Sequence, residues 1–173
     1  HGEWNIKEKE DFLWNLLNNL SNKDELEISL KIHPTSENIS DYEKLCQKFG
    51  INVRIYQKES FWSIAENFDI IVTYGYTTLH SECALIGYRV VLFETNNEFR
   101  VMPFVNSAIK SGFIQKCHSF DKLIPIIFEL TKKNVKFNQE QEEEIQRILY
   151  KFDGKSSERV VNVILKLIDT KNN

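Results

Sequence analysis

Apolar side chains recur along this chain with two different periods. Over residues 5–20 they fall on one helical stripe, whereas over residues 26–32 apolar and polar positions alternate as in a strand. The segment Ile70–Val72 is continuously apolar and β-branched, which is typical of a strand covered on both faces. Together the two periods predict strands at 26–32, 51–56, 69–73, 89–93 and 114–116, and helices at 5–20, 40–49, 61–68, 78–86, 120–132, 139–152 and 156–169.

Turn and cap residues set the expected ends of these elements. Ser40 followed three residues later by Glu43 has the spacing of a capping box, so Ser40 is predicted to start the helix that Gly50 ends. Strands and helices alternate with short connections, which favours a parallel sheet. The predicted fold class is therefore α/β: one domain over residues 1–173, a Rossmann-like parallel sheet with helices on both faces, and a helical C-terminal tail.

Composition narrows the function classes. The chain of 173 residues has 22 Lys and Arg against 25 Asp and Glu, with no basic stripe, so we do not expect a nucleic-acid partner. No apolar run is long enough to cross a bilayer and no signal peptide is readable. Cys46, Cys83 and Cys117 have no zinc spacing and are expected to be reduced thiols, which favours a cytoplasmic protein. The start at His1 lacks a methionine, so the natural protein is expected to extend upstream.

Polar residues follow four of the predicted strands. Because an open parallel sheet binds ligands beside the carboxyl ends of its strands, these segments are the candidate site. They are His33-Pro34, Tyr56-Gln57-Lys58, residues 73–78 and residues 94–97. The chain has no GxGxxG, Walker A or Gly-x-Ser-x-Gly motif, which excludes the usual dinucleotide-binding, nucleoside-triphosphatase and hydrolase signatures.

The turn after the third strand has the composition of an anion site. Gly75 allows close approach of a phosphate to the backbone, and Thr77 and Thr78 add hydroxyl donors at the start of a helix. Glu82 lies one helical turn after Thr78 and could accept both hydroxyls of a ribose. The alternative is an ordinary capped helix in which Thr77 or Thr78 is the cap.

Two histidines differ in their expected role. His33 ends the first predicted strand before Pro34, where its ring could donate to a phosphate or protonate a leaving group. The alternative for His33 is a strand-end histidine bound to backbone. His80 lies within a helix without a metal-ligand partner at useful spacing, and is expected to be structural or exposed to solvent.

These segments, in their order along the chain, resemble a known family. Lys-Ile-His-Pro at 31–34, Asp-Ile-Ile-Val-Thr at 69–73, Thr77-Thr78 with Glu82, and the strand at 89–93 are similar to the nucleotide-donor-binding, C-terminal domain of GT-B-fold enzymes. The group includes teichoic-acid glycerophosphotransferases, capsule sialyltransferases with a His-Pro motif and nucleotide-sugar glycosyltransferases. The resemblance covers about residues 26–94, and 153–159 loosely resembles the tail of the group.

The resemblance implies a role for each matching residue. His33 would be the catalytic residue that contacts the donor phosphate, and Glu82 would bind the ribose. The backbone at Tyr56 and Gln57 would face the base. The phosphate-binding residues would be Gly75, Tyr76, Thr77 and Thr78, and Asn96 and Asn97 would reach the transferred sugar or polyol.

The implied activity is group transfer in surface polysaccharide synthesis. The donor would be a nucleotide-sugar or a CDP-polyol, with no cofactor and no metal, since no Asp-x-Asp motif occurs. An N-terminal acceptor domain, absent from this chain, would supply the catalytic base, so the domain alone would be inactive. The membrane would enter only indirectly, through a lipid-linked acceptor at its inner face.

Two alternatives stay open. A UDP-N-acetylglucosamine 2-epimerase has the same architecture and similar His-Pro and Ser/Glu elements. A non-enzymatic doubly wound binding module, such as a receiver-like domain, would need an Asp at the end of a strand, whereas Asp69 begins its strand.

Overall fold

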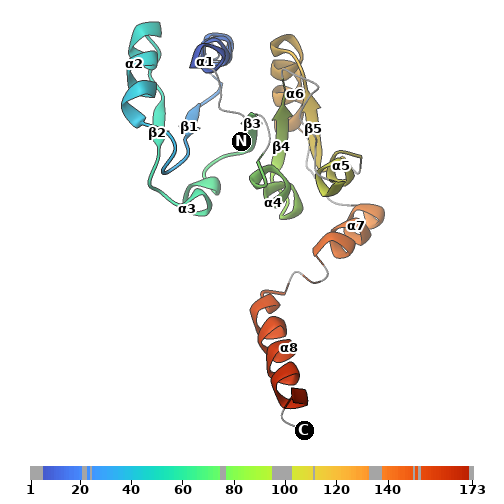
Figure 1. Ribbon diagram of the computed structural model, residues 1–173. Helices are drawn as coiled ribbons and strands as arrows, with labels where there is room; N and C mark the ends of the chain where they lie inside the picture. The colour runs from blue at the N-terminus through green and yellow to red at the C-terminus, as the bar shows by residue number, and fades with distance from the viewer. Residues whose placement is uncertain are drawn as a thin grey trace.

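The computed structural model describes residues 6–20, 23, 25–74, 77–94, 103–110, 112–132, 138–149, 151 and 153–171. Helices and parallel strands alternate through most of it (Figure 1). The helices are α1 Ile6–Leu20, α2 Ile39–Phe49, α3 Phe61–Ala65, α4 Leu79–Leu85, α5 Pro103–Lys110, α6 Phe120–Lys132, α7 Gln139–Leu149 and α8 Ser156–Lys171. The strands are β1 Ser29–Lys31, β2 Arg54–Tyr56, β3 Ile70–Tyr74, β4 Arg89–Phe93 and β5 Ile114–Cys117.

The parallel α/β fold predicted from the sequence is confirmed, with its strands in two small sheets. One sheet has the order β1-β2, and the other has the order β3-β4-β5. Every pairing is parallel, as expected when helices connect successive strands. The predicted helical C-terminal segment is present as α7 and α8.

Helices cover both faces of the three-stranded sheet. Val91 and Phe93 of β4 belong to a core cluster with side chains of α1 and α6. Val90 and Leu92, which point to the opposite face, belong to a second cluster with side chains of α4 and α5. This period-two alternation with two apolar faces explains why the strand reads as a continuous apolar run in the sequence.

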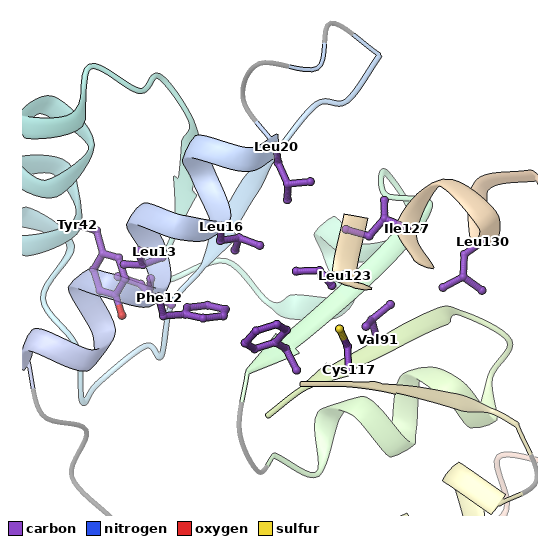
Figure 2. Packing of buried hydrophobic residues seen from close by; sticks show 12 residues of the cluster. Phe12, Leu13, Leu16, Leu20, Tyr42, Val91, Cys117, Leu123, Ile127 and Leu130 are labelled. Atoms are coloured by element: carbon purple, nitrogen blue, oxygen red, sulfur yellow. The ribbon is translucent and has the colours of Figure 1, made fainter. Parts of the chain in front are cut away.

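Helix α1 joins the two sheets into one core. Its residues Phe12, Leu13, Leu16 and Leu20 lie in the same cluster as Tyr42 of α2 and as the side chains of β4 and α6. Figure 2 shows this helix with Leu13 beside Tyr42 and with Leu16 and Leu20 on the side of Leu123 and Ile127. The helical stripe predicted at 5–20 is therefore the shared contact surface of both sheets.

One local expectation needs correction, and one segment without a predicted element proves to be helical. Ser40 does not cap α2: the N-cap is Asn38, whose side chain accepts a hydrogen bond from the Ser40 backbone N–H at 3.1 Å. Ser40 is instead the second residue of the helix. The segment 105–110, which fits neither period clearly, is most of α5, a helix that begins at Pro103 with its φ already suited to a first helical position.

Helix α8 lies apart from the α/β body (Figure 1). Its apolar side chains are between 50% and 60% exposed: Val160, Val161, Val163, Ile164, Leu165, Leu167 and Ile168. None of the described helices is both long and apolar enough to cross a bilayer.

Candidate functional site

The turn after β1 holds the His33 ring against its own backbone. Nδ1 of His33 accepts hydrogen bonds from the backbone N–H groups of Thr35 at 3.3 Å and Ser36 at 3.1 Å. A neutral imidazole with Nδ1 as acceptor carries its proton on Nε2. Since His33 is exposed, the turn presents an Nε2–H donor at the carboxyl end of β1.

The Glu37 carboxylate links this turn to helix α2 through two hydrogen bonds. One carboxylate oxygen accepts from the His33 backbone N–H at 2.6 Å, and the other accepts from the Tyr42 hydroxyl at 2.5 Å. Burial, together with the Glu37 carboxylate, raises the pKa of Tyr42 well above its ordinary range. The hydroxyl is therefore a permanent donor, and it ties the His33 turn to helix α2.

Gln57, at the end of β2, lies beside the same turn. Its side-chain amide donates to the Glu37 carbonyl at 2.6 Å, so the structure brings His33 and Gln57 together as their strand-end positions predict. Its backbone is already engaged: Gln57 N donates to Glu59 at 3.0 Å, and Gln57 O accepts from the Lys31 ammonium at 2.9 Å. A base bound to this backbone would have to replace one of these two side chains.

Tyr56 is buried and its ring is part of the packing rather than of an open surface. It meets Phe68 edge to face, with ring centroids 6.3 Å apart, and the Arg54 guanidinium lies 4.7 Å from its centroid. Its carbonyl accepts from Ile32 N at 3.0 Å, which extends the β1–β2 ladder by one residue.

The turn between β3 and α4 is described from Thr77 onward, and Gly75 and Tyr76 lie outside the described residues. The Thr77 hydroxyl accepts from the Leu79 backbone N–H at 3.3 Å, whereas Thr78 is exposed and makes no side-chain cap bond. Glu82 is exposed one turn into α4, and its backbone N–H donates to Thr78 O at 3.2 Å.

The His33 turn after β1 and the turn between β3 and α4 are separate groups in the described structure. Among the described residues, no hydrogen bond or ion pair joins the His33 turn to Thr77, Thr78 or Glu82. Asn96 and Asn97, predicted to reach the transferred group, lie outside the described residues.

A polar group within the candidate segment 94–97, to which the sequence assigned no individual role, lies at the carboxyl end of β4. Glu94 directly follows the buried strand and is only 3% exposed, and its carboxylate pairs with the Lys116 ammonium of β5 at 2.5 Å. Its backbone N–H donates to Cys117 O at 2.9 Å, which extends the β4–β5 ladder. His118 Nδ1 lies 3.3 Å from Glu94 O, a carbonyl that can only accept, so the proton of this ring is on Nδ1.

His80 faces the same region from α4. The ring is fully buried, which agrees with the structural role expected from the sequence. Burial lowers the pKa of His80 to about 4, and the nearby charge of Glu94 opposes part of that shift. His80 is therefore neutral at neutral pH.

No three His, Cys, Asp or Glu side chains of the described residues gather as a metal site would require. Cys46, Cys83 and Cys117 are free and buried. Comparison with protein-family models, with curated proteins and with solved structures gives no significant match for this chain.

Proposed function

We propose that this domain binds the nucleotide part of an activated sugar or polyol donor at the carboxyl ends of its strands. The observation that supports the proposal is the His33 ring, which two backbone amides hold with its Nε2–H toward solvent. A neutral donor fixed at a strand end suits a phosphate oxygen, because it forms a hydrogen bond without requiring protonation.

The remaining contacts follow from the β3–α4 turn. The exposed Thr78 hydroxyl and the start of α4 would bind a second phosphate oxygen, and the exposed Glu82 carboxylate would accept the two ribose hydroxyls. The Thr77 hydroxyl would contribute less to phosphate binding, because its oxygen already accepts a hydrogen bond from Leu79 N.

In the proposed reaction, an acceptor hydroxyl attacks the transferred group and the bond to the nucleotide phosphate breaks. The electron pair of that bond goes to the leaving phosphate, where the His33 Nε2–H stabilises it with a hydrogen bond. The acceptor proton goes to a base on a separate acceptor domain. The transfer would form part of surface polysaccharide synthesis and would reach the membrane only through a lipid-linked acceptor.

The first test is calorimetry of the chain with UDP, CMP, CDP and GDP at millimolar concentration. We expect at least one to bind, and His33→Ala to weaken it about tenfold through loss of a hydrogen bond to a charged group. Failure of all four to bind would overturn the proposal.

A second arm separates the ribose contact from the phosphate contact. Glu82→Ala should weaken the bound nucleoside diphosphate about tenfold and change pyrophosphate affinity by less than about twofold. Glu66→Ala is the matched control, since this exposed carboxylate precedes β3 and lies at the opposite end of the strand. Equal weakening of both ligands by Glu82→Ala would contradict the assignment.

A further inference from the structure

Helix α8 carries a wide, exposed apolar surface. Seven of its side chains are between 50% and 60% exposed: Val160, Val161, Val163, Ile164, Leu165, Leu167 and Ile168. Among the described residues, neither core cluster includes a side chain of this helix. At about 100° per residue, the seven side chains cover an arc of roughly 200°, about twice the stripe with which a surface helix packs on one core. Burial of an arc this wide requires neighbours on two sides of the helix.

The start of α8 is held by its own residues. The Asp153 carboxylate accepts a hydrogen bond from the Lys155 backbone N–H at 3.0 Å and two from the Arg159 guanidinium, each at 2.9 Å. The helix lies apart from the α/β body (Figure 1). A helix of 16 residues is only marginally stable in water by itself, so a partner that buries its apolar surface would stabilise it.

Most of the apolar side chains form two stripes with identical spacing. The first stripe consists of Val160, Ile164 and Leu167, and the second consists of Val161, Leu165 and Ile168. Both have the alternating four- and three-residue steps by which helices pair in coiled coils. Each member of the second stripe follows a member of the first by one residue, so the two stripes point about 100° apart. A helix in a ring of four meets its two neighbours at about this angle.

Charged residues flank the two stripes with opposite signs. Glu158 and Asp169 lie beside the second stripe, whereas Arg159 and Lys166 lie beyond the outer edge of the first. Arg159 pairs with Asp153 within the chain, which reduces but does not reverse the charge difference between the two sides. In a parallel ring, the first stripe of each helix faces the second stripe of its neighbour, which brings acidic and basic sides together. Antiparallel neighbours would bring like charges together.

We propose that α8 associates with the α8 helices of other copies of this chain, in a parallel ring of about four helices. Each contact is one stripe of a 16-residue helix, smaller than the roughly 1,200 Å² buried in stable complexes, so the assembly is weak and forms only in concentrated solution. A membrane surface fits less well, because helices that lie on membranes are rich in Lys and Arg on the polar side, whereas α8 also has acidic residues there. The inference does not depend on nucleotide binding.

The first test is sedimentation velocity of the chain between about 10 µM and about 1 mM. The average mass should rise from that of one chain toward that of about four. Leu167→Asp interrupts the first stripe and Leu165→Asp the second, and either variant should remain a monomer because the ring closes only through both stripes. Asn162→Asp is the matched control: it adds the same charge on the polar side and should assemble as the wild type does.

The second test reports the orientation of the helices by disulfide formation. Ser157 lies seven residues before Ile164, on the apolar side, so in a parallel ring Ser157→Cys places the thiols of neighbouring copies level with each other. In an antiparallel pair centred on Ile164 they would be about 20 Å apart, too far for a disulfide. Mild oxidation of Ser157→Cys should therefore give covalent dimers. Asn162→Cys, on the polar side, and the wild type, whose cysteines are buried, should give none.

A wild-type chain that remains a monomer up to about 1 mM would overturn the proposal. So would assembly of Leu165→Asp and Leu167→Asp at the wild-type level, or disulfide formation in Asn162→Cys equal to that in Ser157→Cys. Vesicles of phosphatidylcholine and phosphatidylglycerol provide the remaining comparison, and we expect no flotation of the chain with them. Flotation of the monomeric wild type that is lost in Leu165→Asp would assign the apolar surface to a membrane instead.

Discussion

Glu37 is the residue on which the geometry of the His33 turn depends. Its carboxylate accepts from the His33 backbone N–H and from the Tyr42 hydroxyl, and its carbonyl accepts from Gln57. One side chain thus links the ends of β1 and β2 to α2. The position of the proposed phosphate donor, the His33 Nε2–H, therefore depends on the hydrogen bonds of Glu37.

Glu37→Ala should lower the free energy of unfolding by roughly 1–3 kcal/mol, because the buried Tyr42 hydroxyl loses a charged acceptor. Tyr42→Phe should cost less, since it removes the donor as well and leaves Glu37 bonded to the His33 N–H. Urea unfolding of both variants and of the double variant gives the coupling. Strictly additive losses would show that the Tyr42–Glu37 bond contributes nothing.

His80 should make stability depend on pH in a defined window. Its folded pKa of about 4 lies below the ordinary value of 6.5, so the unfolded chain binds the proton more readily. The stabilisation of the folded state that comes from neutral His80 is complete above pH 6.5 and is lost as the pH falls toward about 4. The total loss in the free energy of unfolding is about 3 kcal/mol.

The measurement is the urea midpoint at a series of pH values, for wild type and for His80→Leu. The variant should lose the slope between pH 6.5 and 4, whereas Asp153, whose pKa Arg159 lowers to about 2, acts only below that window. An unchanged slope in the variant would mean that another group titrates there.

At the scale of elements, the local sequence pattern is sufficient to predict the bounds of an element that is long or has turn residues close to both ends. β4 at 89–93 and α6 at 120–132 have the bounds expected from the sequence. β1 and β2 are shorter than their alternating segments, because a strand extends only as far as its partner pairs with it. No local pattern records where that partner stops.

The start of α2 shows a second limit. Both Asn38 and Ser40 are cap-forming residues, and the spacing to Glu43 favours Ser40. The extended backbone of Asn38, with φ of −110° and ψ of 121°, decides the cap. The spacing of cap-forming residues in the sequence does not specify that backbone conformation.

Asn38→Ala should therefore destabilise the chain by about 1 kcal/mol, the usual cost of losing an N-cap. Ser40→Ala should change stability by only a few tenths of a kcal/mol, since alanine is favoured inside a helix. Chemical denaturation of the two single variants distinguishes them. A larger loss for Ser40→Ala would restore the capping box as the start of this helix.

At the scale of the whole molecule, the sequence identifies the candidate strand ends but not which residues meet there. His33 and Gln57 follow strands that turn out to be neighbours, so their proximity follows from topology. Glu94 and Lys116 belong to no motif, and they meet only because β4 and β5 pair with Val90 opposite Ile114. The position of Glu94 directly after the run Val90–Phe93 places it in the candidate segment 94–97, but nothing in the sequence indicates its pairing with Lys116.

The same substitution should cost much more stability in the core than in the C-terminal helix. Leu16 of α1 is buried between the sheets and α6, so Leu16→Ala should cost about 2–5 kcal/mol by removing packed side chain and leaving a cavity. Leu167 of α8 is 60% exposed, so Leu167→Ala should cost no more than a few tenths of a kcal/mol. Urea unfolding followed by circular dichroism measures both. A loss of several kcal/mol for Leu167→Ala would mean that α8 packs against the α/β body in solution, and would contradict its separate position in Figure 1.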